Sequence, residues 1–393
     1  MSRFADKLAS GLLAAFVLDR ALKVAAVVHF FRRKSPPPPS PWPTVTLVQP
    51  VSRGASDLRA ALLSRARLDY PARVQHLFVC DEADEESQAA CREVLREAPG
   101  LCGRVVVVPG GGSPMSFKTV KLQAGMAHAT GDIVCCVDDD IILRPGALTM
   151  LVPYLYEPDV GAVFGLACYT SWRNLPTSLM SAFVNANALL SYVPLTYLAE
   201  PFTITGHCYA LRREVLESVG QFRGMEHHFG DDHELAWRLR ATDLRSVQTP
   251  LVYDVVNHFD TLGQYAVQMK RWFVFPRQML LPAMTRREQA VSFIGSAGNL
   301  MPGLLLLLTL ITRRPGAGRA LGWSLGLSGS IYALCETLYL KRRTPLKGWP
   351  VLAAATLLTP FQVVWALLSD DVIEWRGRRV RVLKGGRYEE VEA

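Results

Sequence analysis

The segment GDIVCCVDDDI, Gly131 to Ile141, joins an apolar strand-like run to three consecutive aspartates. Its residues Ile133 to Val137 are all apolar, as is typical of a strand covered on both faces of a sheet. Asp138, Asp139 and Asp140 follow at the point where such a strand would end. Open α/β sheets bind ligands beyond the carboxyl ends of their strands. The segment therefore predicts an α/β domain with acidic groups at its binding edge.

Further strands and helices are expected to alternate around this segment. Apolar runs predict strands over Thr44 to Val51, Val74 to Cys80 and Gly103 to Pro109, and helix-like stretches cover Ser56 to Leu68, Asp84 to Glu97 and Lys118 to His128. Alternation of this kind favours a mostly parallel sheet.

The three aspartates are a candidate metal site. In an extended segment, alternation would point Asp138 and Asp140 to the same side. Two such carboxylates can bind a hard cation, Mg²⁺ or Mn²⁺, while diphosphate oxygens fill other positions. A solvated acidic loop is the alternative for a DxD motif considered alone. The preceding strand and the other acidic motifs favour the metal site.

A second acidic group, VCDEADEE, follows the run from Val74 to Cys80. A carboxylate at Asp81 can accept hydrogen bonds from a base or a ribose. Asp84 precedes Glu85 and Glu86, which makes it a good cap for the next helix. We therefore favour a binding role for Asp81 and a capping role for Asp84.

A third acidic group opens an amphipathic helix in FGDDHELAW. We expect Asp231 to cap this helix and Asp232 to face the cleft. A carboxylate beside a bound substrate can act as a general base toward a hydroxyl. His233 is a rival base, although a histidine at a helix start is more often structural. His207, in GHC before YALRREVL, is equally suited to face an acceptor or to be structural.

The sequence QMKRW places Gln268, Arg271 and Trp272 at helical spacing, with Gln268 and Arg271 on one face. An arginine offers a fixed fork of donors to phosphate oxygens, and a tryptophan offers a flat apolar wall. The same residue types also gather in membrane-interface belts, and that alternative would prevail for this motif alone.

The composition is apolar, with half of the 393 residues hydrophobic and a fifth charged. The net charge of +8 comes largely from clusters that border or follow long apolar runs: Arg32 to Lys34, Arg313 and Arg314, Lys341 to Arg343, and Arg376 to Arg381. This placement is typical of a membrane protein and argues against a nucleic-acid binder. Eight cysteines without zinc spacing predict free buried thiols in a reducing compartment.

Apolar runs near both ends predict membrane helices. Leu8 to Phe31 is long enough to span or anchor, and Asp19 and Lys23 within it are four residues apart and can pair. The runs Val291 to Thr312, Ala320 to Leu340 and Trp349 to Ser369 are also long enough to cross. Three crossings would leave the basic tail opposite the α/β domain, whereas a re-entrant segment would leave it on the same side.

These patterns predict six regions. They are an N-terminal membrane anchor and basic flank over 1–34, a stiff Pro-rich linker over 35–43, a cytoplasmic α/β domain over 44–272, an interfacial segment over 273–290, C-terminal membrane helices over 291–369, and a basic tail over 370–393. PGGGS, Pro109 to Ser113, is expected to be a flexible loop, because no GK[ST] follows it.

The order of these motifs resembles family 2-like inverting glycosyltransferases of the GT-A fold, and most closely the ceramide glucosyltransferase branch, family 21. The branch motifs are matched by Asp81, by Asp138 with Asp140, by Asp231 with Asp232, and by Gln268 with Arg271 and Trp272. PVSRG (Pro50 to Gly54), FKTVKL (Phe117 to Leu122) and EWRGRRVRVLKGGRYEE (Glu374 to Glu390) are similar to its first-strand loop, its PKxxxL segment and its tail. Ser116-Phe117 and His207 depart from the branch pattern.

The resemblance implies a role for each matched residue. It assigns Pro50, Arg53, Asp81, Lys118 and Asp138 to the UDP-sugar donor, Asp138 and Asp140 to Mg²⁺ or Mn²⁺, Asp232 to the general base, Arg271 with Gln268 to the leaving UDP, and Trp272 to the acceptor entrance.

The implied protein is an integral, multi-pass membrane glycosyltransferase that moves glucose from UDP-glucose to ceramide or a similar lipid. One alternative is a hopanoid lipid glycosyltransferase that uses UDP-GlcNAc. More remote alternatives are a processive polysaccharide synthase, which shares QxxRW, and a non-catalytic lipid-binding membrane protein. The sequence leaves the donor sugar, the lipid, the metal and the oligomeric state open.

Overall fold

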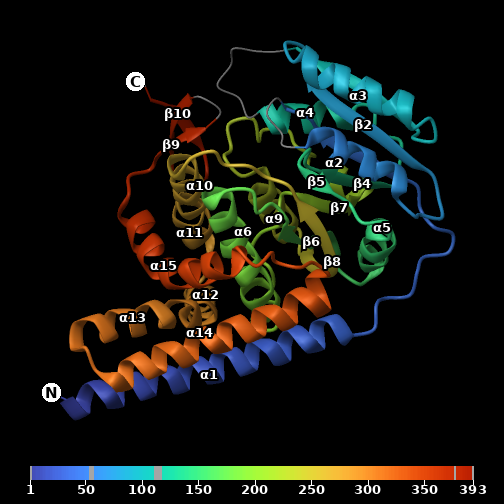
Figure 1. Cartoon of the computed structure of the whole chain (residues 1–393). Helices are drawn as coiled ribbons and strands as arrows, with labels where there is room; N and C mark the ends of the chain where they lie inside the picture. Colours follow the sequence, from blue (N-terminus) through green and yellow to red (C-terminus); the bar gives the residue numbers. More distant parts are fainter. Residues whose placement is uncertain (1, 53–56, 110–116, 376–377, 392–393) are drawn as a thin grey trace.

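The computed structural model describes residues 2–52, 57–109, 117–375 and 378–391, and its centre is an eight-stranded sheet (Figure 1). The strand order is β3-β2-β1-β4-β7-β6-β8-β5. The strands are β1 Val45–Pro50, β2 Val74–Asp81, β3 Gly103–Val108, β4 Ile133–Val137, β5 Ile141–Ile142, β6 Val160–Tyr169, β7 Cys208–Arg212 and β8 Arg245–Val255.

The sheet is mostly parallel, as the sequence predicted. Strands β3, β2, β1 and β4 run parallel to one another, and β6 runs parallel to β8. Strand β7 is antiparallel to both β4 and β6, and β5 is antiparallel to β8. The antiparallel strand β7 therefore joins two parallel groups, and the aspartate turn after β4 lies next to this junction.

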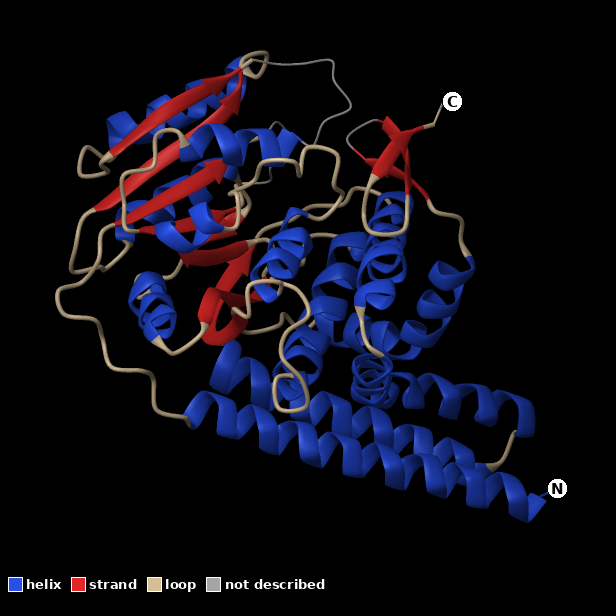
Figure 2. Ribbon diagram, turned by 180° about the vertical axis from the view of Figure 1, so that it is seen from behind, coloured by secondary structure: helices blue, strands red, loops and turns tan. Residues whose placement is uncertain are grey.

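Both faces of the sheet are covered by helices, which explains why its central strand is wholly apolar (Figure 2). In β4, Cys135 packs into the core on one face and Cys136 into the core on the other. Helices α5 Ala147–Leu151 and α6 Leu175–Asn187 cover the first face; α4 Phe117–Met126, α8 Arg213–Ser218 and α9 Asp231–Arg240 cover the second. Helices α2 Leu58–Ser64 and α3 Glu85–Glu97 bury a smaller cluster beside β2.

The remaining helices form a helical layer that lies beside and beneath the sheet (Figure 1). They are α1 Ser2–Arg32, α7 Val193–Leu195, α10 Leu262–Phe275, α11 Leu281–Ala283, α12 Arg286–Ala297, α13 Met301–Thr312, α14 Pro315–Cys335 and α15 Gly348–Leu368. Helices α1 and α14 lie side by side along the bottom of the molecule. Short 3₁₀ and π turns cover Arg65–Arg67, Val152–Tyr156, Ala188–Tyr192, Pro276–Leu280, Gly298–Leu300 and Glu336–Leu340.

Within the described ranges, two helices are long and apolar enough to cross a membrane. They are Arg286–Thr312, which includes α12 and α13, and Gly348–Leu368, which is α15. The runs expected in α1 and α14 do not meet this measure. The pair predicted within α1 is confirmed, because Lys23 Nζ lies 3.1 Å from Asp19 Oδ1, and Arg20 Nε lies 3.0 Å from Asp19 Oδ2.

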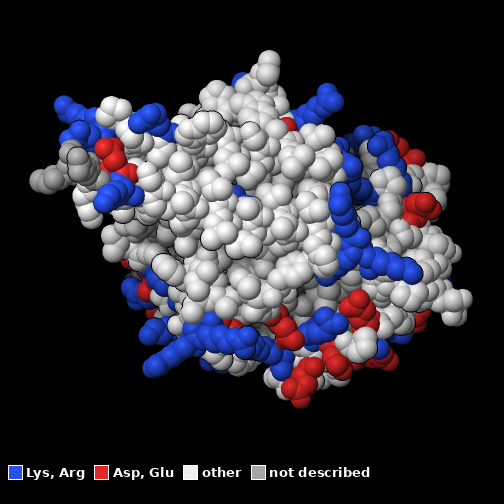
Figure 3. All heavy atoms as spheres, turned by 90° about the horizontal axis from the view of Figure 1, so that it is seen from below, with Lys and Arg blue, Asp and Glu red and all other residues white. Residues whose placement is uncertain are grey.

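The face beneath these helices is largely uncharged. Figure 3 shows this face with Lys and Arg side chains gathered at its rim. Large apolar side chains are exposed on the same helices, among them Leu22 of α1, Ile311 of α13 and Trp323 of α14. A broad apolar surface with a polar border marks a site of contact with a membrane or a partner.

The tail forms a separate antiparallel sheet of β9 Val372–Trp375, β10 Arg378–Val382 and β11 Tyr388–Glu390. Its apolar residues pack with Val274 of α10 and Phe229. The Phe229 amide donates to the Gly386 carbonyl at 2.7 Å, and the Tyr388 amide donates to the His227 carbonyl at 3.2 Å. The tail therefore lies against the α/β domain, beside the loop that leads to Asp231 and Asp232.

The cysteines are free thiols, as predicted. Seven of the eight are buried, and Cys102 is exposed.

Candidate active site

The three aspartates lie in a turn between β4 and β5, not in the extended segment that the sequence suggested. The Asp138 amide donates to the His207 carbonyl at 2.9 Å. The Asp139 carboxylate turns toward the loop after β1 and accepts from the Ser52 amide at 2.6 Å. Asp139 therefore fixes a neighbouring loop, while its two flanking carboxylates remain for other tasks.

Lys118, near the start of α4, connects the acidic groups. Its Nζ lies 2.9 Å from Asp138 Oδ1 and 3.7 Å from Asp231 Oδ2, and it donates to the Gly206 carbonyl at 2.9 Å. Burial alone would lower the pKa of this ammonium. The carboxylates of Asp138, Asp231 and Asp232 outweigh that effect and raise the pKa well above its ordinary value. Lys118 is therefore a fixed positive charge at the sheet edge.

The Asp140 carboxylate fits a cation ligand. Its Oδ1 is buried and has no hydrogen-bond partner. Burial raises the pKa of Asp140 well above its ordinary value, and the charges of Asp138 and Asp139 add to the rise. Within the described ranges no three His, Cys, Asp or Glu side chains form a metal cluster. A cation at Asp138 and Asp140 would thus need phosphate oxygens and water as further ligands, which suits Mg²⁺.

The Asp232 carboxylate lies in a slot between two glycines. A Cβ on Gly206 would stand 2.6 Å from Asp232 Oδ2, and a Cβ on Gly230 would stand 3.3 Å from Asp232 Oδ1 and 2.5 Å from a Phe275 ring carbon. Burial raises the pKa of Asp232 to about 7, and the adjacent Asp231 carboxylate adds to the rise. A carboxylate with a pKa near neutral pH is well matched to general base catalysis.

The prediction that Asp231 caps α9 is wrong. The N-cap is Gly230, no side chain bonds there, and Asp231 is the first residue of the helix. Asp231 instead faces Lys118, and burial raises its pKa. A glycine is needed at position 230 because a side chain there would clash with Phe275 and Met279.

The two histidines lie among aromatic rings. The His233 ring is buried and meets Phe275 edge-on, with ring centroids 5.9 Å apart. The His207 ring meets Tyr169 edge-on, with centroids 6.4 Å apart. Burial lowers the pKa of both imidazoles, so both are neutral at pH 7. For His207, the positive charges of Lys118 and Arg271 act in the same direction.

The two aspartates of VCDEADEE, Asp81 and Asp84, have different surroundings. Asp84 caps α3, as predicted, by accepting from the Ser87 amide at 3.2 Å and the Ser87 hydroxyl at 2.8 Å. Asp81 ends β2, and its Oδ1 accepts from the Ala83 amide at 2.9 Å. Pro50 is buried at the end of β1. Arg53 and most of PGGGS lie outside the described residues.

The QMKRW residues lie on α10, where the sheet meets the helical layer. Trp272 meets Tyr169 edge-on at a centroid distance of 6.3 Å and Phe183 at 6.4 Å. Gln268 and Arg271 are half-buried. The positive charge of Arg271 lowers the pKa of His207, as that of Lys118 does.

The sequence did not predict the role of Arg65, whose side chain donates hydrogen bonds to the backbone of the aspartate turn. Its fully buried guanidinium donates to the Ile141 carbonyl at 2.5 Å and the Asp138 carbonyl at 3.3 Å, on either side of the turn. It also donates to Gln49 Oε1 at 2.8 Å and to the Ala61 carbonyl at 2.9 Å. No local signal marked it, because Arg67 stands two residues later in the same segment and is exposed.

We expect Arg65→Ala to destabilise the fold by about 2–4 kcal/mol, because several buried acceptors would each lose a donor at roughly 1–3 kcal/mol. The exposed neighbour Arg67 provides the control, and Arg67→Ala should leave stability within about 0.5 kcal/mol of the parent. Thermal or denaturant unfolding of the purified proteins measures both. Equal stability of the two variants would contradict the role of Arg65.

We also expect Tyr388→Ala to slow turnover. Tyr388 is buried, and its hydroxyl donates to the Glu226 carbonyl at 3.3 Å, so it helps to hold the loop before Asp232. Misplacement of a catalytic group by about 1 Å can lower rates on the order of 10²-fold. The exposed residue Glu389 provides the control. A Tyr388→Ala protein with the same turnover number as Glu389→Ala would show that the tail does not position the loop.

Known proteins resemble this chain over most of its length. A mannosyltransferase, PcManGT from Pyrobaculum calidifontis, solved in complex with GDP-Man and Mn2+, superposes with a TM-score of 0.52 at 20% identity and covers 92% of this chain and 99% of its own. This likeness supports the GT-A fold. An N-acetylglucosaminyltransferase of Mesorhizobium japonicum is 25% identical over 88% of this chain and 76% of its own length.

A second N-acetylglucosaminyltransferase, from Rhizobium meliloti, is 24% identical over 69% of this chain and 65% of its own length. The family model described as glycosyl transferase family 21 matches residues 12–388, which include every described residue of the acidic site, α10 and most of the tail sheet. This chain therefore belongs to glycosyl transferase family 21 and is a glycosyltransferase.

Proposed function

We propose that this protein is a membrane-associated inverting glycosyltransferase that transfers glucose from UDP-glucose to the hydroxyl of ceramide or a similar lipid. The observation that carries the proposal is the Asp232 slot between Gly206 and Gly230, directly beside the Lys118–Asp138 pair. It puts a candidate base with a pKa near 7 next to the ammonium group of Lys118, which can pair with a diphosphate.

The donor would bind along the carboxyl edge of β1, β2 and β4. Asp81 and Pro50 would hold the uridine, and Lys118 and Arg271 would contact the diphosphate. Asp138 and Asp140 would hold Mg²⁺ or Mn²⁺, and PcManGT was solved with Mn2+. The bound ion would neutralise charge that develops on the diphosphate as it leaves. When the donor binds, its phosphate oxygens would replace Asp138 as the partner of Lys118.

In the transfer step, Asp232 would accept the proton of the acceptor hydroxyl. The hydroxyl oxygen would form a bond to the anomeric carbon of the sugar, and the bond from that carbon to the β-phosphate oxygen would break. UDP would leave with the electron pair of that bond, and Lys118 and Arg271 would stabilise its charge. Attack opposite the leaving group inverts the anomeric configuration.

A lipid acceptor is favoured by the position of α10. Trp272 faces Tyr169 on the side of the sheet and Phe183 on the side of the helical layer. The exposed face of that layer is largely uncharged, with Lys and Arg among the charged side chains at its rim, which suits contact with a membrane (Figure 3). We propose that the α/β domain faces the cytoplasm, because Arg32 ends α1 and Arg33 and Lys34 follow it.

The comparisons favour a second candidate donor. Two relatives that cover more than two thirds of this chain are named N-acetylglucosaminyltransferase. UDP-GlcNAc is therefore the principal alternative to UDP-glucose, with a hopanoid-like lipid as its acceptor. A processive polysaccharide synthase and a non-catalytic lipid-binding protein remain more remote alternatives.

A panel of donors and acceptors tests the proposal. Purified protein would be incubated with UDP-glucose or UDP-GlcNAc and with ceramide, a hopanoid lipid or no lipid, and products would be identified by mass spectrometry. We expect a hexosylceramide from UDP-glucose. A product only from UDP-GlcNAc would establish the second donor, and a polymer would establish a synthase. Tight lipid binding without UDP release under any condition would refute a transferase.

A further inference from the structure

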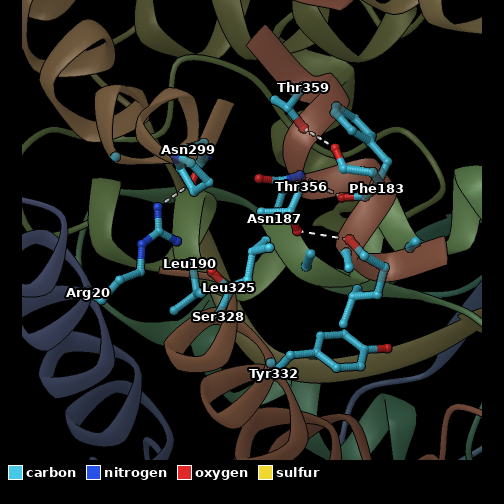
Figure 4. Close-up of a pocket in the computed structure, with 18 of the residues that line it drawn as sticks. Arg20, Phe183, Asn187, Leu190, Asn299, Leu325, Ser328, Tyr332, Thr356 and Thr359 are labelled. Atoms are coloured by element: carbon cyan, nitrogen blue, oxygen red, sulfur yellow. Dashed lines mark hydrogen bonds between the residues drawn. The ribbon is translucent and has the colours of Figure 1, made fainter. Parts of the chain in front are cut away.

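A cavity of about 190 Å³ lies in the helical layer, apart from the acidic site (Figure 4). Residues of α1, α6, α14 and α15 line most of it, and the lining includes Leu190, Leu325, Gly329, Leu352 and Ala355. Neither the acidic residues nor QMKRW contribute to this lining. The transfer chemistry described above therefore does not account for the cavity.

Most polar residues on the cavity wall are already satisfied by backbone carbonyls. The Ser328 hydroxyl donates to the Ser324 carbonyl at 2.8 Å, and the Thr356 hydroxyl donates to the Leu352 carbonyl at 2.9 Å. The Asn187 amide donates to the Phe183 carbonyl at 2.7 Å (Figure 4). The hydroxyl donors of Ser328 and Thr356 are therefore occupied, and most of the other lining residues are apolar. An apolar cavity of about 150 Å³ in another protein stays dry and binds benzene.

One side of the cavity carries a charge that is held in place. Arg20 Nη2 donates to Asn299 Oδ1 at 2.6 Å, and Arg20 Nε lies 3.0 Å from Asp19 Oδ2. Figure 4 shows Arg20 and Asn299 on one side of the cavity and Phe183 on the other. The charge at this end of the cavity is therefore paired within the protein, on the side opposite Phe183.

Phe183 connects this cavity to the site. Its ring lines the cavity, and its centroid lies 6.4 Å from that of Trp272 and 6.4 Å from that of Phe273. The cavity and the QMKRW helix therefore share one wall. A chain bound behind Phe183 would keep the polar end of its molecule close to Trp272.

We propose that this cavity binds the hydrocarbon chain of the acceptor lipid and thereby holds its hydroxyl group near Trp272. The inference rests on the proposed function for the identity of the acceptor, and it adds a binding site remote from the acidic residues. Arg20 would not contact the lipid itself. It holds Asn299 in place and so fixes the shape of the cavity wall.

Two glycines of α14 supply a matched pair of variants. A Cβ on Gly329 or on Gly326 meets no atom within 4 Å, so neither substitution forces the helix apart. Gly329 lines the cavity, whereas Gly326 is exposed. We expect Gly329→Leu to fill the cavity and lower kcat/KM for a long-chain acceptor on the order of ten-fold or more. Gly326→Leu should leave it unchanged, and both variants should keep the parental KM for the UDP-sugar.

Photolabelling tests the site without turnover. Ceramide with a diazirine in its acyl chain should label peptides of α6, α14 and α15 in the parent and in Gly326→Leu, but much less in Gly329→Leu. Equal labelling and equal acceptor kinetics in the two variants would overturn the cavity assignment and leave the proposed function intact. Absence of transfer to any lipid would remove the proposed function, and loss of labelling in Gly329→Leu alone would still support a lipid chain in the cavity.

Discussion

Asp232→Asn is expected to remove sugar transfer almost entirely, with kcat reduced about 10²–10⁴-fold, the contribution of a general base. The amide has the same shape and fits the slot between Gly206 and Gly230, so the fold should persist. The KM for the UDP-sugar should change little, because Asp232 acts on the acceptor. Initial rates with saturating donor and varied lipid measure the effect.

His233 provides the matched control, because it adjoins Asp232 and was the rival base. Its ring is buried against Phe275, and burial lowers its pKa. His233→Gln should therefore lose no more than about ten-fold in turnover. A loss of this size would come from disturbed packing, whereas removal of a general base costs more. If His233→Gln were the inactive variant and Asp232→Asn the active one, the assignment of the base would be reversed.

The pH profile gives an independent check of the same residue. A base must be deprotonated, so activity should fall as the pH drops through the pKa of Asp232, which burial raises to about 7. Transfer should be half-maximal near pH 7 and reach a plateau above it. The residual rate of Asp232→Asn should lack this limb. An unchanged acidic limb in that variant would assign the titration to another group.

The sheet was predictable because each central strand obeys a local rule. The strand β4 is buried on both faces, so its five residues are all apolar, and the run shows in the sequence. Asp84 was predictable for the same reason, since a helix cap depends on residues within one turn. The cap that the sequence assigned to Asp231 belongs instead to Gly230, and the base role of Asp232 stays a prediction.

Contacts between distant segments were not predictable. The slot for Asp232 needs a glycine at position 206, and the support for the aspartate turn comes from Arg65. Nothing local to either residue distinguishes it from an ordinary loop glycine or a surface arginine. The same holds for the tail. Its basic character is evident in the sequence, but its contact with the loop at Phe229 depends on the complete fold.

The helical layer is fixed to the sheet by a buried ion network. Asp254 of β8 is fully buried, and it pairs with Arg144 at 2.8 Å. Arg342, in the segment between α14 and α15, donates to the same carboxylate at 3.1 Å through its Nε. Breaking one partner of a buried pair is strongly destabilising, so the network resists relative movement. This network therefore connects β8 directly to the segment between α14 and α15.

Removal of the divalent cation should lower the rate of sugar transfer as much as substitution of its proposed ligand Asp140. Chelation is expected to lower transfer by about 10²–10³-fold, which corresponds to roughly 3–4 kcal/mol of lost stabilisation of the leaving diphosphate. Added Mn²⁺ or Mg²⁺ should restore the parent but not Asp140→Asn. Asp132→Asn, an exposed carboxylate before the same strand, should behave like the parent. Binding of Mn²⁺ in the presence of UDP, followed by electron paramagnetic resonance, gives a readout that does not depend on turnover.

The thermal stability of Asp140→Asn distinguishes a role of Asp140 as a metal ligand from a purely structural role. One oxygen of the Asp140 carboxylate, Oδ1, is buried, and burial together with the neighbouring like charges raises the pKa of Asp140. In the absence of metal, its ionised form therefore destabilises the fold, and Asp140→Asn should unfold at a higher temperature than the parent. With Mn²⁺ and UDP present, the parent should gain stability and Asp140→Asn should gain little. A variant that is less stable without metal, yet equally stabilised by it, would show that Asp140 supports the turn and does not bind the cation.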